Sequence, residues 1–279
     1  MCGYGSEAGA ALTSHPGINQ IVFTGSVQTG QAIAHAAANN VIPAVLELGG
    51  KSAAIVFDDA DIEQVVKDVR WGIFFNAGQV CSAMSRLIVH EKVYDQVVKQ
   101  VTEMAQGLKV DAGIELNEFG ANMGPLVSEQ QVIKAKQMCQ NAALEGARIM
   151  TGGERLNRDG FFLQPTVIAD VTPEMNIAKD EIFGPVIVVL KFDQDQEATA
   201  IANSTDYGLV GGVYSKDINR AMLVARDVKA GQIFINEWYA GGVETPFGGY
   251  GKSGYGREKG REALLNYVQT KNIAISIKG

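Results

Sequence analysis

Short apolar runs that resemble strands alternate with amphipathic helical segments along this chain of 279 residues. The runs QIVFTG, AVLEL and SAAIVFD are bounded by glycine or aspartate, which is typical of buried strands. Further strands are expected at PVIVVLKF and QIFINEW, and the helical segment DINRAMLVARDVKAG stands before the second of these. Because strands joined by helices form mostly parallel sheets, the pattern predicts an α/β fold with a parallel-rich sheet.

Three further segments are predicted to be helices with one apolar face each. The first, DADIEQVVKDVRWGIFF, starts with acidic residues and has these positions on its apolar face: Ile62, Val65, Val66, Val69 and Ile73. The second covers about Val93 to Leu108. The third begins at Ser128, with Gln131 placed to complete a capping box. Cys139 shares the apolar stripe of this third helix, so we interpret it as a core residue.

Composition and charge exclude several kinds of protein. The net charge of −7 and the lack of a basic run argue against nucleic acid or an anionic membrane as partner. The cysteines are odd in number and far apart, which fits neither a disulfide framework nor a metal cluster. We therefore expect a reducing cytoplasm, and the sequence shows no secretory leader and no run long enough to span a bilayer. None of the histidines has a ligand partner at helical spacing, so no metal site is expected: they are His15, His35 and His90.

Cys81, in the stretch NAGQVC, stands on a short connection between a predicted helix and the strand-like run RLIVH. A cysteine outside a periodic apolar element is a candidate nucleophile, provided that a base is near. Glu47, in LELGGKS, is a lone carboxylate between two leucines. Apolar neighbours raise the pKa of a carboxyl group, which suits a proton acceptor near neutral pH. The alternatives are a free surface thiol and a surface glutamate at a strand end.

Three glycine-rich or acidic stretches are candidate ligand sites. FTGSVQTG follows a strand and leads into a helix, where glycines, a serine hydroxyl and free amides can hold a pyrophosphate. DEIFGPV places Glu181 and Phe183 before a strand, where a carboxylate can accept bonds from ribose hydroxyls and a ring can pack on a nicotinamide. An acidic residue at a strand entrance is the alternative. TPFGGYGKSGYGRE is too rich in glycine for a regular element and indicates a loop near a ligand.

Five motifs together identify the chain as resembling the aldehyde dehydrogenase superfamily. FTGSVQTG, LELGGKS, GQVC, EIFGPV and PFGGYGKSGYGRE occur in the order and approximate spacing of that family, and the resemblance extends from about residue 1 to the end of the chain. It implies oxidation of an aldehyde to a carboxylic acid with NAD, or NADP, as the hydride acceptor. The implied fold is an aldehyde dehydrogenase-like catalytic domain with the trailing part of a Rossmann-like cofactor domain.

The resemblance also assigns roles to individual residues. Cys81 would form a thiohemiacetal and then a thioester, its backbone amide would help to hold the oxyanion, and Glu47 would be the general base that activates water. The remaining residues are carried over as cofactor contacts: Gly25, Ser26 and Gly30 along the pyrophosphate, Gly49 at a close approach, Glu181 on the nicotinamide ribose and Phe183 beside it. Glu258 matches a second acidic position that relays protons in some relatives. The alternative for Glu258 is a glutamate at a helix start.

The resemblance divides the chain into a partial cofactor domain (1–48), a catalytic domain (49–252) and a return to the cofactor domain with a C-terminal oligomerisation strand (253–279). Family members carry a longer N-terminal stretch, so we expect a truncated chain. The full-length protein is expected to be a homo-dimer or homo-tetramer. The chain also has Gly251 where relatives often carry lysine, which leaves any monovalent-cation site on that backbone open.

The stretch NEWYAGGVET corresponds to the region that lines the aldehyde funnel in the family. Trp238 and Tyr239 either shape that pocket or pack in the core or an interface. No arginine stands there, which argues against a carboxylated semialdehyde as substrate. Three functions stay open from the sequence: an aldehyde dehydrogenase, a thiol esterase remnant that retains only the cysteine and the base, and a non-catalytic binding protein of this fold.

Overall fold

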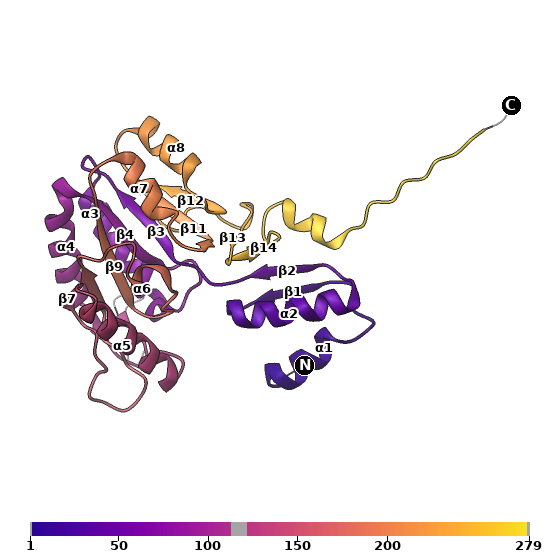
Figure 1. The fold of residues 1–279 in the computed structure, drawn as a ribbon, viewed down its shortest axis with the longest axis horizontal. Coiled ribbons are helices and arrows are strands. Elements are labelled where there is room, and N and C mark those ends of the chain that lie inside the picture. The colour runs from indigo at the N-terminus through magenta and orange to yellow at the C-terminus, as the bar shows by residue number, and fades with distance from the viewer. Residues whose placement is uncertain (1, 113–121, 278–279) are drawn as a thin grey trace.

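A seven-stranded sheet is the centre of the computed structural model, which describes residues 2–112 and 122–277 (Figure 1). The strand order is β12, β11, β3, β4, β9, β8, β7, and every neighbouring pair is parallel except β7 with β8. The strands are β3 (Ser52–Val56), β4 (Met84–His90), β7 (Arg148–Thr151), β8 (Thr166–Ala169), β9 (Val186–Phe192), β11 (Val210–Tyr214) and β12 (Gln232–Ile235). The predicted α/β fold with a parallel-rich sheet is therefore confirmed.

Helices cover both faces of this sheet (Figure 1). Those that pack on it are α3 (Ile62–Phe74), α4 (Glu91–Gln106), α5 (Glu129–Leu144), α7 (Asp195–Ala202) and α8 (Ile218–Asp227). Their apolar faces meet the buried strands in one core, and Val65, Val69 and Ile73 of α3 are fully covered. Ile62 and Val66 are half-buried because they lie at the margin of the face that α3 turns to the sheet. Cys139 has no exposed surface, so its interpretation as a core residue is confirmed.

A smaller three-stranded sheet lies beside the main one (Figure 1). Its strands are β1 (Ile21–Thr24), β2 (Ala44–Glu47) and β14 (Gly254–Tyr255), and α2 (Val27–Asn40) packs on β1 and β2. β1 pairs with β2 in parallel, and β14 pairs with β2 in the antiparallel direction. The expectation of a buried strand is wrong for β1, where Val22 is 42% exposed. The reason is that β1 has β2 on one side and no strand on the other among the described residues.

Short elements connect these units. They are η1 (Gly5–Gly9), α1 (Ala10–Thr13), η2 (Phe75–Gly78), β5 (Lys109–Val110), β6 (Asn122–Met123), α6 (Asn176–Lys179), β10 (Tyr207–Gly208), β13 (Tyr250–Gly251) and η3 (Glu262–Tyr267). Residues 268–277 form no regular element and extend away from the body of the molecule (Figure 1). No helix among the described residues is long and apolar enough to cross a membrane.

Candidate active site

Cys81 is presented by a tight left-handed turn at the end of α3. Asn76, Ala77 and Gly78 have φ angles of 50°, 53° and 71°, a region that favours glycine. At Gly78 a Cβ would collide with the backbone carbonyl of Gly184, so a side chain is excluded by space as well as by conformation. The turn reverses the chain and delivers Cys81 to the entrance of β4.

The side chain of Gln79 fixes this turn to the next part of the chain. Its Nε2 donates to Asn76 O at 3.1 Å, and its Oε1 accepts from the backbone N–H of Val127 at 2.8 Å. These two side-chain hydrogen bonds to backbone groups favour one conformation of the turn, because each ties Gln79 to a different segment. The Gly-Gln pair before the cysteine therefore has a structural purpose: the glycine permits the turn and the glutamine holds it.

Cys81 is half-buried and surrounded by acidic rather than basic groups. Burial raises the pKa of its thiol above the ordinary range, the backbone N–H of Ser82 lowers it, and the carboxylates of Glu47 and Glu181 raise it further. The chain thus places both predicted acidic residues near the predicted nucleophile. The resting group is the thiol, so the formation of thiolate requires a proton acceptor.

Glu47 ends β2 and has the chemical character of such an acceptor. Its side chain is only 2% exposed, and neither carboxyl oxygen has a hydrogen-bond partner among the described residues. Burial raises the pKa of Glu47 to about 8; the charge of Glu258 adds to this and that of Arg257 opposes it. A carboxyl group that titrates close to neutral pH can both hold and release a proton under physiological conditions.

Glu258 reaches Glu47 through the glycine-rich loop. The backbones of Phe247 and Glu258 exchange two hydrogen bonds of 2.7 Å, and Gly254 of β14 pairs with Glu47 of β2. These pairings bring the carboxylate of Glu258 close enough to raise the pKa of Glu47. The alternative of a helix-start glutamate is wrong, because η3 begins only at Glu262.

Glu181 lies on the connection that leads into β9, against the glycine pair that follows Glu47. Gly50 donates its N–H to Glu181 Oε1 at 3.0 Å, and a Cβ at Gly49 would collide with Glu181 Oε2. The close approach of the Glu181 carboxylate therefore requires glycine at position 49, whether or not a ligand is bound. Glu181 Oε2 accepts no hydrogen bond from the described residues, so it can accept one from a ligand hydroxyl.

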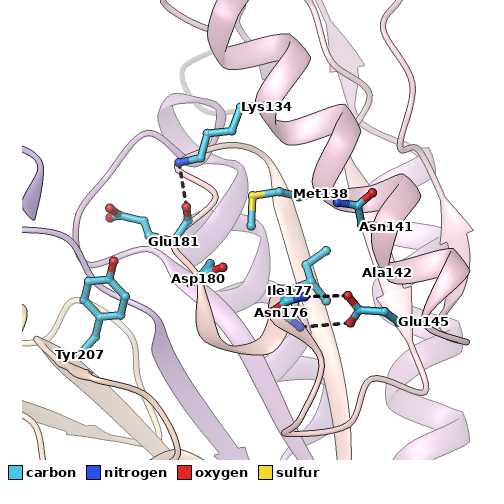
Figure 2. A pocket seen from close by; sticks show the side chains of 10 residues that line it. All are labelled: Lys134, Met138, Asn141, Ala142, Glu145, Asn176, Ile177, Asp180, Glu181 and Tyr207. Atoms are coloured by element: carbon cyan, nitrogen blue, oxygen red, sulfur yellow. Dashed lines mark hydrogen bonds between the residues drawn. The ribbon is translucent and has the colours of Figure 1, made fainter. Parts of the chain in front are cut away.

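Two residues of α5 hold the segment of Glu181 and Phe183, and sequence reasoning did not assign them to the site. Gln131 Nε2 donates to the carbonyls of Ile182 at 2.6 Å and Phe183 at 2.8 Å. Lys134 Nζ donates to the carbonyl of Glu181 at 2.9 Å (Figure 2). The predicted capping box is only half formed: Ser128 accepts from the Gln131 N–H at 3.2 Å, but the Gln131 side chain turns to the 181–183 segment instead.

A hollow of about 520 Å³ opens between α5, α6 and β10 on one side of Glu181 (Figure 2). The side chains of Lys134, Asp180, Glu181 and Tyr207 line it on one side, and Glu145 binds Asn176 on the other. Phe183 is 37% exposed and has a φ of 58°, which turns the backbone sharply before β9. These features leave the surface of the 181–183 segment accessible to a ligand.

The pyrophosphate candidates lie at the start of α2. Ser26 is the N-cap of this helix, and its Oγ accepts from the N–H of Thr29 at 3.2 Å. Gly25 donates its N–H to the carbonyl of Glu47 at 3.0 Å, which joins this helix start to the end of β2. Gly30 packs one turn inside the helix, where a Cβ would lie 2.6 Å from Leu48. Close packing against Leu48 therefore explains the glycine at position 30 without reference to a ligand.

Trp238 and Tyr239 have different surroundings although they are neighbours. Trp238 is buried, stacks edge-on with Phe234, and fills the space above Gly212, so it belongs to the core. Tyr239 is part-exposed and has a φ of 67°. Burial raises the pKa of Tyr239 to about 12, and its hydroxyl lies near the Ser82 side chain. Of the two aromatic candidates, Tyr239 is the one that lies near the nucleophile.

The backbone conformation and close neighbours of Gly251 explain why glycine stands at this position. Its φ is 58°, and a Cβ there would collide with the backbone carbonyl of Asp206. The adjacent Lys252 points elsewhere and pairs with the Asp206 carboxylate at 2.7 Å. A lysine at position 251 would not fit this backbone without a shift. In the part of the chain that the structure describes, no group of histidine, cysteine and acidic residues could hold a metal ion.

Comparison with known proteins identifies the family of the chain. The model of the aldehyde dehydrogenase family matches residues 1–273. An aldehyde dehydrogenase of Emericella nidulans is 46% identical over 274 residues, which cover 98% of this chain and 54% of that protein.

Solved structures show the same likeness. Aldehyde dehydrogenase from Bacillus cereus, in an NAD+ complex, has a TM-score of 0.94 at 44% identity and covers 99% of this chain and 56% of its own. Betaine aldehyde dehydrogenase from Staphylococcus aureus, also in complex with NAD+, has a TM-score of 0.91 at 40% identity. The match covers 96% of this chain and 53% of that protein. The chain thus spans about half the length of the relatives it matches. With a family match over nearly its whole length and this likeness in fold, the chain belongs to the aldehyde dehydrogenase family.

Proposed function

We propose that this chain provides the catalytic half of an NAD-dependent aldehyde oxidation, with Cys81 as nucleophile and Glu47 as general base. One observation carries the proposal: the buried carboxyl group of Glu47, which has no hydrogen-bond partner among the described residues, lies close enough to Cys81 for its charge to act on the thiol. A core would not retain such a carboxyl group for stability, because burial without a partner costs free energy. Membership of the aldehyde dehydrogenase family supports the same assignment.

NAD is the proposed cofactor, because related enzymes from Bacillus cereus and Staphylococcus aureus were solved with NAD+. The residues fit such a ligand. Ser26 and Gly25 stand at the N-terminus of α2, where backbone N–H groups and the helix dipole favour a pyrophosphate. Glu181 Oε2 is free to accept a ribose hydroxyl, and Phe183 offers an exposed ring. When bound, the nicotinamide accepts the hydride that the aldehyde carbon loses.

The first half of the proposed reaction takes place on Cys81. The thiol proton passes to Glu47, and the sulfur attacks the carbonyl carbon of the aldehyde, whose π electrons move to the oxygen. The Cys81 backbone N–H helps to hold this oxyanion. As the C–H bond breaks and its electron pair leaves as hydride, the C=O bond reforms and a thioester remains on Cys81.

Glu47 releases the thiol proton to solvent by way of Glu258, and as a carboxylate again it serves the second half. It takes a proton from a water molecule that attacks the thioester carbon, the C–S bond breaks, and the carboxylic acid leaves while the sulfur recovers as thiolate. The pKa of Glu47, about 8, places its titration near the working range of a general base. Glu258 would pass the proton onward from the buried carboxyl group, because it is the acidic residue whose charge acts most strongly on Glu47.

An uncharged aldehyde with an apolar or aromatic body is the proposed substrate class. Tyr239 lies near Ser82, next to the nucleophile, and no arginine is present between Asn236 and Thr245 to pair with a second carboxylate. The relative from Staphylococcus aureus is named a betaine aldehyde dehydrogenase. A cationic amino aldehyde is therefore the competing class, and the two are separated by comparing benzaldehyde with betaine aldehyde.

Acyl transfer to the cysteine tests the proposal with the chain as it is. The wild type, Cys81→Ser and Glu47→Gln would be incubated with p-nitrophenyl acetate and analysed by intact-protein mass spectrometry. We expect transient acetylation of the wild type, an acetyl adduct on Glu47→Gln that forms more slowly but lasts, and none at position 81 in Cys81→Ser. Equal adduct lifetimes in the wild type and Glu47→Gln would remove Glu47 from the mechanism.

A second assay separates the alternative functions. NADH formation from NAD+ and an aldehyde would establish the dehydrogenase. Ester hydrolysis without NADH formation would favour the thiol esterase, and the absence of both activities would favour a non-catalytic protein. We further propose that the full-length protein is a homo-dimer or homo-tetramer in the cytoplasm. The exposed side chains of Ile273, Ile275 and Ile277 and the three free cysteines are consistent with these two proposals.

A further inference from the structure

Arg86, on the strand that follows Cys81, is buried with only 2% of its surface exposed. Its guanidinium donates three hydrogen bonds, all to backbone carbonyls. Nε binds Lys51 O at 2.8 Å, while Nη1 and Nη2 bind the carbonyls of Ile201 at 2.8 Å and Ala202 at 2.7 Å. One side chain thus joins the segment after Glu47 to the last residues of α7.

No carboxylate neutralises this guanidinium: none of the ion pairs found in residues 2–112 and 122–277 includes Arg86. Burial alone lowers its pKa to about 9. The carbonyls at the C-terminus of α7 offset part of the cost, because this end of a helix carries partial negative charge. Burying a cation to satisfy the carbonyls at a helix end nevertheless costs free energy. The helix end also does not explain the third contact, which Arg86 makes to the Lys51 carbonyl.

The contact to Lys51 lies at an irregularity in the sheet. The register between β3 and β4 shifts between Ser52 and Ala53, and Ala53 is the residue that pairs with Arg86. A bulge of this kind takes a backbone group out of the regular ladder and bends the strand. The extra residue is Ser85 of β4, which stands between Met84 and Arg86, the partners of Ser52 and Ala53. Arg86 follows this bulge and donates to the Lys51 carbonyl, so it ties the residue before β3 to β4.

The segment that is fixed in this way touches the proposed catalytic and cofactor groups. Gly50 donates to Glu181, and a Cβ at Gly50 would lie 2.5 Å from the backbone oxygen of Cys81. Ser253 Oγ donates to Gly49 O at 2.7 Å from the other side. A displacement of the 49–51 segment would therefore change the places of the nucleophile and of both acidic residues together.

We propose that Arg86 is a positioning residue: its three-carbonyl fork holds the residue before β3 at the bulge of β4 and thereby sets the placement of Glu47 and Glu181 beside Cys81. This inference rests on the proposed function of Cys81 and Glu47. A planar fork is needed because the three acceptors come from two different segments, and lysine cannot reproduce its geometry. The role differs from catalysis, since Arg86 is separated from the reacting groups by the 49–51 backbone.

The test compares Arg86→Lys and Arg86→Gln with the wild type in the full chain of 279 residues. Arg86→Lys keeps the positive charge and loses the fork, while Arg86→Gln keeps a single NH2 group as donor and loses the charge. Tyr94→Phe is the matched control. It removes the buried hydrogen bonds of Tyr94 to Asp170 and Val189, in a different part of the fold. The readout is the pH profile of Cys81 alkylation by iodoacetamide, followed by peptide mapping, with thermal unfolding measured beside it.

We expect the midpoint of the Cys81 profile to fall by about half a pH unit or more in Arg86→Lys, because water enters and the two carboxylates move away from the thiol. Tyr94→Phe should lose thermal stability with an unchanged profile. A profile in both Arg86 variants identical to that of the wild type would overturn the proposal, as would failure of both to fold, which would make Arg86 a purely structural residue. A wild-type Cys81 that is unreactive at every pH would instead overturn the proposed function on which the inference rests.

Discussion

The carboxylate of Glu258, which follows the short strand β14 that pairs with β2, adds to burial in raising the pKa of Glu47. Like charges that share a site favour protonation of one of them. The two residues are far apart in sequence, and the glycine-rich loop brings them together. Protonation of Glu47 is therefore coupled to the placement of that loop.

Glu47→Gln should stabilise the chain in a pH-dependent way. The pKa of Glu47 is about 8 in the folded chain and near 4.5 in the unfolded one, so the folded state binds the additional proton between these values. The contribution of protonated Glu47 to the free energy of unfolding is complete below pH 4.5 and is lost progressively as the pH rises to about 8. The gain in melting temperature of Glu47→Gln should grow over the same range. Glu103→Gln, at an exposed position of α4, is the control and should show no such trend.

Lys51→Met should also stabilise the chain, with the opposite dependence on pH. Lys51 is 1% exposed, and its Nζ has no partner among the described residues. Burial and then Arg86 lower its pKa from 10.5 to about 7. The cost of the buried charge is complete below pH 7 and disappears as the pH rises to 10.5, so the gain from Lys51→Met should be largest in acid.

Denaturant unfolding at several pH values measures the effect of Lys51→Met. Lys92→Met removes an exposed ammonium group and serves as the comparison. If Lys51→Met destabilised the chain at pH 6, the ammonium group would have a partner that offsets its burial.

The three cysteines should react with an alkylating probe in an order set by burial. Cys139 has no exposed surface, and burial raises its pKa to about 12, so it should react last. Cys81 is half-buried and should be labelled well ahead of it, with the exposed Cys2 as an acceptable competitor. Peptide mapping after brief exposure to iodoacetamide gives the order. Labelling of Cys139 before Cys81 would contradict the assignment of the nucleophile.

Gln131→Leu should loosen the segment that carries Glu181 and Phe183. The substitution removes two hydrogen bonds to carbonyls and should cost about 1–2 kcal/mol. Hydrogen exchange of the peptide around residues 181–184 should become faster while that of β9 stays slow. Gln137→Leu, on the exposed side of the same helix, should leave the exchange unchanged. Equal protection in both variants would show that Gln131 does not hold the segment.

The repeating pattern of apolar residues was sufficient to predict the α/β class and the main helices, because strands and helices bury faces of different periodicity. Cys81, Glu47 and Glu181 could be selected from motifs, although their roles stay predictions. The partners of Arg86 could not be found in this way: they lie 35, 115 and 116 residues away along the chain. The apolar run of β1 indicates a buried strand and does not reveal its exposure, since an edge strand and a central strand can have the same run.

The left-handed turn before Cys81 has a consequence for inheritance as well as for shape. Every missense change of one base in a glycine codon introduces a side chain, and at Gly78 each such side chain meets both an unfavourable φ and the carbonyl of Gly184. Asn76 also has a positive φ, but asparagine tolerates this conformation, and aspartate or glycine would adopt it as well and lose only the hydrogen bond to the Gln79 carbonyl. In a library of random single-base mutants, Gly78 should therefore be the most intolerant position of the turn, and a screen for function would detect its loss without any change to the reactive sulfur.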